Sequence, residues 1–256
     1  MRRRPEARIA ETVALGLIQG PAELLPISSS AHVELLPWLL GWDVARLDGA
    51  RRKEVGVALH GGTALALRPG RPALMLVATV PPAVAGYLLE DLVERRLGTP
   101  RAMAVGLLAG SALLVVCDRA PGHRAAADAT AADAVWLGLA QAAALVPGVS
   151  RSGATRSAAR ALGFTREAAA ALSAEVALPV LAGATVLKGV RLAQRRPPAR
   201  TVSALAAGAA AAFASTSAAL RLRRREPPAA VWAAYRAALA AAVLAADRRV
   251  RHTSRP

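Results

Sequence analysis

Charged residues are kept out of long stretches of this chain. No charge interrupts residues 73–89, 102–116, 134–150 or 202–220, one glutamate (Glu175) interrupts 168–187, and one arginine (Arg236) interrupts 229–246. Segments that cross hydrocarbon require such segregation, because an uncompensated charge there costs about 2.5–3.5 kcal/mol or more. A soluble protein with alanine-rich buried helices is the alternative, but six such runs exceed what the core of one short chain encloses. We therefore expect an all-α, polytopic integral membrane helical bundle.

The strongly basic balance does not indicate nucleic-acid binding. The net charge is +16, yet the basic residues are scattered over every loop, and aromatic residues, which stack on bases, make up only 3%. Anionic lipid headgroups explain the same charges, so the expected partners are membrane lipids and not nucleic acid. Both termini are basic as well, so the charge bias gives no membrane orientation. A lone Cys117 excludes an intramolecular disulfide and a cysteine metal cluster.

One phrase occurs twice in the chain. Residues 16–19 (Gly-Leu-Ile-Gln) lead to Pro26 and three serines, and residues 138–141 (Gly-Leu-Ala-Gln) lead to Pro147 and a Ser-Arg-Ser sequence. Regular helix stops at each proline, so we predict two interrupted, re-entrant segments, and inverted-repeat membrane proteins place their site where such segments meet. The expected organisation is a single membrane domain, 1–256, with halves at about 1–117 and 134–256 joined by the loop 118–133.

Both interrupted segments carry polar groups suited to phosphate chemistry. The first has Glu23, three serines and His32, and the second has Arg151 among small hydroxyl residues. A carboxylate at membrane depth is expensive unless it meets a metal, a cation or a proton, and a guanidinium clamps phosphate oxygens in a bidentate fork. Each segment alone also admits a structural interpretation, with serines capping helices and charges at the membrane interface. Together they supply a cation-binding carboxylate, an acid–base imidazole, hydroxyl nucleophiles and a charge-stabilising arginine.

These two segments resemble the signatures of a known family. Residues 23–32, Glu-Leu-Leu-Pro-Ile-Ser-Ser-Ser-Ala-His, resemble the first signature of the undecaprenyl-diphosphate phosphatases, the bacitracin-resistance family, usually Glu-Phe-Leu-Pro-Ile-Ser-Ser-Thr-Gly-His. Residues 147–155, Pro-Gly-Val-Ser-Arg-Ser-Gly-Ala-Thr, match the second, Pro-Gly-x-Ser-Arg-Ser-Gly-x-Thr. The resemblance covers essentially the whole chain, including residues 166–169 and the Tyr-Arg pair at 235–236.

The resemblance implies a hydrolase in the bacterial plasma membrane. It would remove the terminal phosphate of a C55 polyprenyl diphosphate, returning the lipid carrier to peptidoglycan synthesis and conferring bacitracin resistance, with a site that opens on the outer side. A divalent cation, Mg²⁺ or Ca²⁺, is implied as cofactor. The metal, the prenyl chain length and the oligomeric state, for which a homodimer is open, are not fixed by the sequence.

By matching position, the resemblance also assigns roles to individual residues. Glu23 would help hold the metal, Ser29 would be the nucleophile or a phosphate ligand, His32 the acid–base group, and Arg151 the diphosphate clamp. The residues that would line the phosphates are Ser28, Ser30, Ser150, Ser152 and Thr155. Whether serine or water attacks phosphorus is left open.

The departures from the family pattern that bear on the chemistry lie in the first segment. Gln19 stands where the family usually has a second glutamate, so the metal would be held by Glu23 and the uncharged amide oxygen of Gln19, with weaker affinity. Ser30 and Ala31 stand in place of threonine and glycine. Reduced or altered activity is therefore one expectation.

Three other polar residues lie inside apolar runs. We expect Glu175 to pair with an arginine. The alternative is that Glu175 replaces the carboxylate missing at position 19. For His60 we expect helix packing or a hydrogen bond rather than a ligand role. For Arg236 we expect its side chain to reach the headgroups rather than the site.

Two rivals to the hydrolase remain from the sequence. The first is a transporter that moves the lipid phosphate carrier between leaflets without hydrolysis, since inverted repeats and broken helices are typical of transporters. The second is a membrane scaffold with a decayed site.

Overall fold

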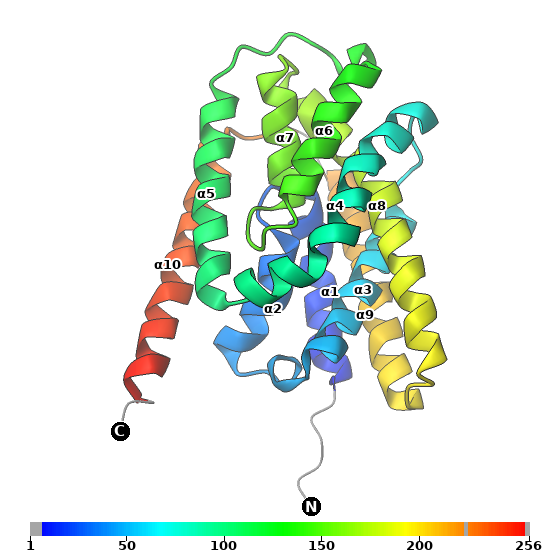
Figure 1. The fold of residues 1–256 in the computed structure, drawn as a ribbon, viewed down its shortest axis with the longest axis vertical. Coiled ribbons are helices and arrows are strands. Elements are labelled where there is room, and N and C mark those ends of the chain that lie inside the picture. Colours follow the sequence, from blue (N-terminus) through cyan, green and yellow to red (C-terminus); the bar gives the residue numbers. More distant parts are fainter. Residues whose placement is uncertain (1–6, 223–224, 254–256) are drawn as a thin grey trace, which may run out of the picture.

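Each apolar run of the sequence forms a helix in the computed structural model, which describes residues 7–222 and 225–253 (Figure 1). The outermost residues of both predicted halves, 1–6 and 254–256, lie outside the described residues. Short 3-10 helices occupy Asp43–Arg46 (η1) and Ala126–Asp128 (η2). The α-helices of the described residues are α1 Ile9–Leu24, α2 Ser29–Leu40, α3 Gly49–Ala66, α4 Pro72–Leu97, α5 Pro100–Asp118, α6 Ala131–Ala143, α7 Arg151–Ala161, α8 Arg166–Gln194, α9 Ala199–Leu222 and α10 Ala229–Thr253.

Five of these helices are long and apolar enough to cross a membrane. Their qualifying segments are Pro72–Leu89, Pro100–Asp118, Arg166–Gln194, Ala199–Leu222 and Ala229–Arg249. Large apolar side chains on the outside of the bundle remain exposed, for example Tyr87 at 90% and Leu65 at 79%. Exposed apolar area on this scale fits contact with lipid tails and not with water. The expectation of an all-α polytopic membrane protein is confirmed, and the alternative of a soluble helical protein is rejected.

Two helical hairpins turn back inside the bundle. In the orientation of Figure 1, α1 runs upward from the lower end and α2 returns, whereas α6 runs downward from the upper end and α7 returns. α1 ends one residue before Leu25-Pro26, and α6 ends before the turn that contains Pro147. The tips touch, because the hydroxyl of Ser152 donates to the carbonyl oxygen of Leu25 at 2.8 Å. Both interruptions predicted from the prolines are present.

The packing of the two hairpins is reciprocal. α1 packs along α9, and α6, its counterpart in the sequence repeat, packs along α4. Glycines make these contacts close: a methyl group on Gly16 would overlap the backbone of Gly208 in α9, and one on Gly138 would lie 2.9 Å from the carbonyl oxygen of Ala78 in α4. Opposite directions and matched neighbours support the proposal that the chain consists of two inverted halves joined by the loop 118–133.

α7 forms a helix outside the apolar runs of the sequence, although it contains three arginines. Its arginines find buried partners that hydropathy does not reveal. Arg156 Nη1 lies 2.6 Å from Glu226 Oε2, and Arg160 Nε lies 3.2 Å from Asp118 Oδ1. Ion pairs therefore stabilise a polar helix inside the bundle.

Helix ends also extend beyond the apolar runs. α3 begins at Gly49, before the apolar part of its sequence, because Asp48 caps it by accepting a hydrogen bond from the Arg51 backbone at 2.9 Å. α8 continues to Gln194 through part of the basic sequence 191–200. Of the basic sequence 221–225, residues 223–224 lie outside the described part of the chain.

Candidate active site

Glu23 and Arg151 meet where the two hairpin tips come together. Arg151 Nη2 lies 2.9 Å from Glu23 Oε1, and Nε of the same guanidinium lies 3.3 Å from that oxygen. The two side chains come from positions 128 residues apart and are only 4% and 15% exposed. Water is thus nearly excluded from the pair, and each charge depends on the other for compensation.

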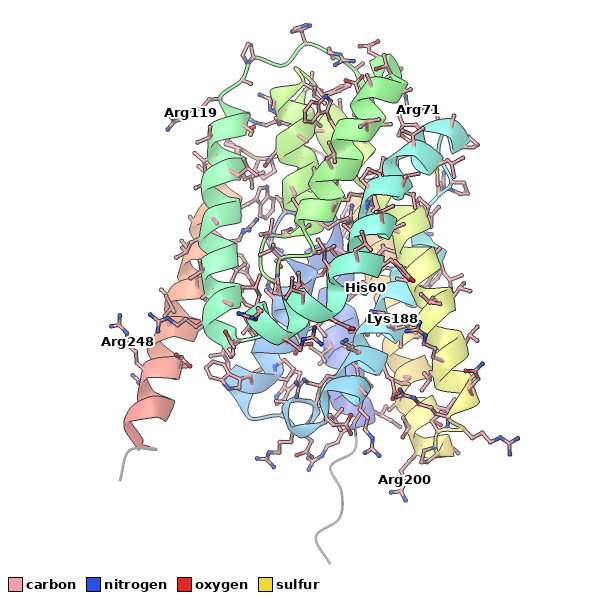
Figure 2. The ribbon with its side chains drawn as sticks, viewed as in Figure 1. His60, Arg71, Arg119, Lys188, Arg200 and Arg248 are labelled. Atoms are coloured by element: carbon pink, nitrogen blue, oxygen red, sulfur yellow. The ribbon has the colours of Figure 1, made fainter. Side chains whose placement is uncertain are left out.

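The second carboxylate oxygen of Glu23 gathers three further polar groups. Ser29 Oγ donates to Glu23 Oε2 at 2.5 Å, Gln19 Nε2 donates at 3.1 Å, and His60 Nε2 lies 3.4 Å away. His60 is labelled inside the bundle in Figure 2, between the ends marked by Arg119 and Arg200. Of the two expectations for His60, helix packing or hydrogen bonding, the contact with Glu23 agrees with the second. The sequence offered no sign of which partner His60 contacts.

Arg151 is held in place by α8 as well as by Glu23. Its Nη1 donates to the backbone oxygen of Ser173 at 2.6 Å, and Thr155 donates to the Ser173 hydroxyl at 2.7 Å. Thr155 therefore braces the guanidinium from one turn along α7. Ser173 was not singled out from the sequence, where it is one polar residue in an apolar helix.

The serines at the hairpin tips shape the start of α2 and of α7 in the same way. Ser28 and Ser150 both adopt positive φ, 72° and 75°, and each caps the following helix. The Ser28 hydroxyl also lies 3.2 Å from that of Ser30, and the Ser150 hydroxyl lies 3.3 Å from that of Ser152. Two helix N-termini, each rich in hydroxyls, therefore begin at the hairpin tips. Such termini bind anions through their free backbone N–H groups and the helix dipole.

His32 follows on α2 and is turned toward α10. Its Nδ1 lies 2.7 Å from the Ser28 carbonyl oxygen, and its Nε2 lies 2.6 Å from the Tyr235 hydroxyl. A carbonyl only accepts, so Nδ1 carries the proton of the neutral ring and Nε2 accepts from the phenol. The two rings are also stacked, with centroids 5.6 Å apart. Tyr235 joins the site by these contacts.

The neighbour of Tyr235 is also part of this region. The Arg236 side chain is 0% exposed, so the expectation that it reaches the headgroups is wrong. It donates to the carbonyl oxygens of Pro26, Gly148 and Val149, which belong to the two hairpin tips. Long arginine side chains near helix ends commonly extend to the interface, and Arg236 is only the eighth residue of α10, but these carbonyl oxygens hold it inside the bundle.

Comparison with known proteins identifies the family of this chain. The family model of the bacitracin resistance protein BacA matches residues 12–68 and 71–242. The chain belongs to the BacA family. Relatives named undecaprenyl-diphosphatase are similar to most of the chain: that of Pelotomaculum thermopropionicum is 39% identical over 203 residues, covering 70% of this chain and 75% of the relative. The one from Alcanivorax borkumensis is 40% identical over 209 residues, covering 73% and 78%.

The BacA resemblance implies a divalent cation, and the donors beside Glu23 can be compared with what such an ion requires. Gln19 Oε1 is buried next to Glu23 and has no hydrogen-bond partner among the described residues. Over the same part of the chain, no cluster of three or more His, Cys, Asp or Glu side chains forms a complete metal site. Mg²⁺ is usually held by one or two carboxylates together with substrate phosphates. The residues present therefore fit a cation that binds together with a diphosphate.

Glu175 does not join the BacA-type site. Its carboxylate accepts hydrogen bonds from Arg71 Nη2 at 2.8 Å and Nε at 3.0 Å, at the start of α4. It also accepts one from the Arg71 backbone at 2.6 Å. The first of the two expectations, pairing with an arginine, is thus confirmed, and Glu175 is not the substitute for a carboxylate at position 19.

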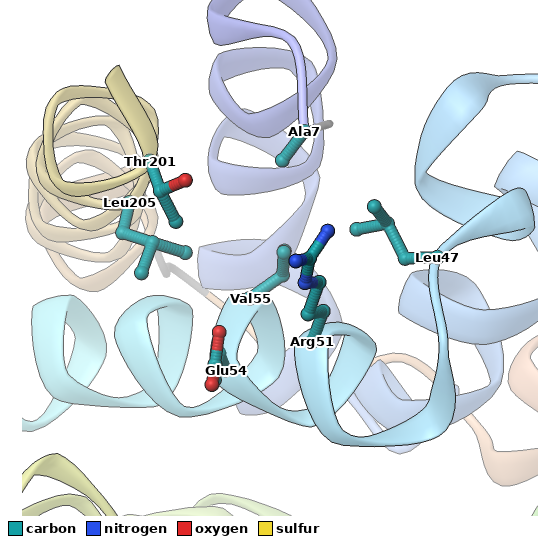
Figure 3. Close-up of a pocket in the computed structure, with 7 residues that line it drawn as sticks. All are labelled: Ala7, Leu47, Arg51, Glu54, Val55, Thr201 and Leu205. Carbon is teal, nitrogen blue, oxygen red and sulfur yellow. The ribbon is translucent and has the colours of Figure 1, made fainter. Parts of the chain in front are cut away.

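A small surface pocket lies away from these groups, at the start of α3. It contains none of the predicted site residues, so it is not the candidate active site. Its lining consists of Ala7, Leu47, Arg51, Glu54, Val55, Thr201 and Leu205 (Figure 3).

Proposed function

We propose that this protein hydrolyses undecaprenyl diphosphate, a C55 polyprenyl diphosphate, to the monophosphate and inorganic phosphate. Membership of the BacA family and relatives named undecaprenyl-diphosphatase support this activity. The observation that carries the proposal is the buried contact between Glu23 and Arg151 at the meeting point of two helix N-termini. The reaction returns the lipid carrier to peptidoglycan synthesis and underlies bacitracin resistance.

The diphosphate is proposed to bind between the starts of α2 and α7. Free N–H groups and the positive ends of both helix dipoles favour its negative charge. Ser28, Ser30, Ser150, Ser152 and Thr155 line the phosphates, and Arg151 clamps two phosphate oxygens with its planar fork. To do so, part of the Arg151 guanidinium exchanges its contact with Glu23 for the substrate. Apolar helices beside the hairpin tips hold the prenyl tail in the lipid.

The hydrogen bond from Ser29 to Glu23 suits the activation of a nucleophile. In hydrolysis, an oxygen attacks the terminal phosphorus, the bond from phosphorus to the bridging oxygen breaks, and prenyl phosphate leaves. On the serine route, a water then attacks the phosphoserine, the bond from phosphorus to Ser29 Oγ breaks, and inorganic phosphate leaves. Glu23 Oε2, 2.5 Å from Ser29 Oγ, accepts the proton of that hydroxyl or of a water in its place. His32 serves as the acid–base group that exchanges the proton with solvent. Trapping labelled phosphoserine at Ser29, or failing to trap it, decides between the two nucleophiles.

A divalent cation, Mg²⁺ or Ca²⁺, is proposed at Glu23 and Gln19. The buried free oxygen of Gln19 supports this position. Such an ion would neutralise phosphate charge in the transition state.

We place the opening of the site on the outer side of the plasma membrane. Cell-wall assembly takes place there, so a carrier released from it as diphosphate presents its phosphates on that side. A homodimer is one candidate for the oligomeric state. Light scattering of the protein in detergent measures that state.

Phosphate release from undecaprenyl diphosphate by the purified protein tests the proposal. We expect release by the wild type, loss of release with a chelator, and loss in Glu23→Gln and Arg151→Ala. Exposed Glu167 and Arg119 provide matched controls, because Glu167→Gln and Arg119→Ala remove the same groups far from the site. Removing one partner of a buried ion pair also destabilises a fold, so thermal unfolding of each variant is measured in parallel.

The same assay separates the hydrolase from a carrier that moves the lipid between leaflets. Only the hydrolase yields phosphate from pure protein and substrate. Absence of phosphate from folded wild type supplied with Mg²⁺ or Ca²⁺ would reject the proposed activity.

A further inference from the structure

Arg236 is a buried cation that the proposed chemistry leaves unused. Its side chain is 0% exposed, and it is the eighth residue of the apolar helix α10. Among the described residues no carboxylate lies within ion-pair distance of it, and its Nε has no hydrogen-bond partner. A guanidinium without a counter-ion is costly inside a membrane protein, and such residues usually serve a function.

The partners of Arg236 belong to both hairpins. Nη1 donates to the carbonyl oxygen of Pro26 at 3.1 Å, in the first tip. Nη2 donates to the carbonyl oxygens of Gly148 at 3.1 Å and Val149 at 2.9 Å, in the second tip. These residues come directly before the capping serines of α2 and α7. One planar group thus connects the turns from which both anion-binding helix ends begin.

Two glycines leave room for this contact. A methyl group on Gly153, in α7, would lie 2.8 Å from Arg236 Nη1, and one on Gly110, in α5, would overlap Nη2. Distances below 3 Å are not tolerated without displacement, so any side chain at either position pushes the guanidinium away. The glycine in the Ser-Arg-Ser-Gly motif therefore has a physical reason: it admits an arginine from another helix.

We propose that Arg236 is a positioning residue that locks the tips of the two hairpins at the spacing the diphosphate requires. Its positive charge lies behind the two helix N-termini that face the substrate and adds to their attraction for phosphate. The proposal rests on the proposed function, because it names what holds that site together.

Three substitutions separate the contribution of the planar, two-nitrogen guanidinium from the contribution of its positive charge. Arg236→Lys keeps the charge but offers one nitrogen instead of a fork, so we expect lower kcat with KM little changed. Arg236→Gln removes both, so we expect KM to rise and kcat/KM to fall about a hundredfold or more, the usual cost of misplacing groups by about 1 Å. Arg248→Gln removes an exposed arginine from the same helix (Figure 2) and should match wild type.

A methyl substitution approaches the same contact from another helix. Gly110→Ala, on α5 and outside the substrate-binding motif, should reproduce the loss in kcat/KM, because the methyl group would displace both Arg236 Nη2 and the carbonyl oxygen of Val149 to which it donates. It keeps the test informative where Arg236→Gln fails to fold.

Measuring the distance between the two hairpin tips tests the role of Arg236 without any enzymatic turnover. Spin labels at Ser30 and Val146, both exposed and one near each tip, are placed in a Cys117→Ser background. Pulsed electron resonance should give a narrow distance distribution with Arg236 and a broad one with Arg236→Gln or Gly110→Ala. This result stands or falls independently of whether the wild type hydrolyses the lipid.

Two outcomes would overturn the proposal. One is an Arg236→Gln protein with lower thermal stability but wild-type kcat and KM per folded molecule, which would make Arg236 merely structural. The other is an unchanged distance distribution between the labelled tips.

Discussion

At the scale of single residues, Glu23 determines how the candidate site works. One oxygen of its carboxylate contacts Arg151, and the other receives Ser29, Gln19 and His60. A buried carboxylate with this many donors is held as an anion in one rotamer. Substitutions of its neighbours should therefore change the chemistry of the site more than its shape.

Gln19→Glu restores a second carboxylate beside Glu23. The amide now donates to Glu23 Oε2 at 3.1 Å, so the change replaces attraction with repulsion between two like charges unless a cation lies between them. We expect phosphate release to be preserved or raised at saturating cation, and half-saturation to occur at a lower cation concentration. Titration of activity with Mg²⁺ and Ca²⁺ measures both effects. A cation dependence equal to that of wild type would remove Gln19 from the proposed metal site.

The two imidazoles of the site are expected to contribute unequally. Loss of an acid–base group typically costs 10²–10⁴-fold in rate, so His32→Gln should lower kcat by about that factor. His60→Gln keeps a donor near Glu23 and should cost less, since His60 contributes one long contact of 3.4 Å. Single-turnover kinetics of both variants gives the comparison. A larger loss for His60→Gln would transfer the acid–base role to His60.

At the scale of elements, glycines determine how closely the helices approach one another. A methyl on Gly62 of α3 would overlap the carbonyl oxygen of Ala209 in α9, whereas one on Gly56 of the same helix meets nothing within 4 Å. Small residues at such crossings are what allow membrane helices to pack, because no hydrophobic force drives them together in lipid.

The two glycines give a matched pair of substitutions. Gly56→Ala should leave stability unchanged or raise it by up to about 1 kcal/mol, the helix-propensity gain. Gly62→Ala should lower it, by about 1–3 kcal/mol, because α9 must shift to make room. Thermal unfolding in one detergent compares them. Equal unfolding temperatures for the two variants would contradict the close crossing of α3 and α9.

The long helices and both hairpins were predictable because lipid imposes simple requirements. A span must exclude charge, and a proline such as Pro26 must end regular helix. α7 was not predictable, since its stability depends on partners such as Glu226 that are distant in sequence. Arg236 was misjudged, and the partner of His60 was not foreseen, for a related reason: a single polar residue in an apolar run does not reveal which face of the helix it occupies. The motif residues Glu23, Ser29 and Arg151 were expected together, and they lie together.

At the scale of the whole molecule, charge gives no orientation in the membrane. Basic side chains lie at both ends of the bundle, as the labelled Arg119 and Arg71 at one end and Arg200 at the other show (Figure 2). The rule that positive residues stay inside the cell therefore does not decide which end faces the cytoplasm.

Cysteine labelling in intact cells tests the proposed outward opening. Ser30 is exposed at the start of α2, so a Ser30→Cys, Cys117→Ser protein should react with a membrane-impermeant thiol reagent from outside. Arg119→Cys and Arg200→Cys in the same background mark the two ends, and only one of them should react. Labelling of Ser30→Cys only after permeabilisation would place the opening on the cytoplasmic side.

The order of synthesis has a consequence for Arg236. Both hairpins precede α10 in the chain, so the ribosome delivers the two signature segments to the translocon well before the residue that joins them. A nascent chain at that stage already holds Glu23 and Arg151, yet Arg236 does not yet connect its two hairpin tips. Activity therefore begins late in biogenesis, and a frameshift between α9 and α10 would leave a product with every signature residue and no working catalyst.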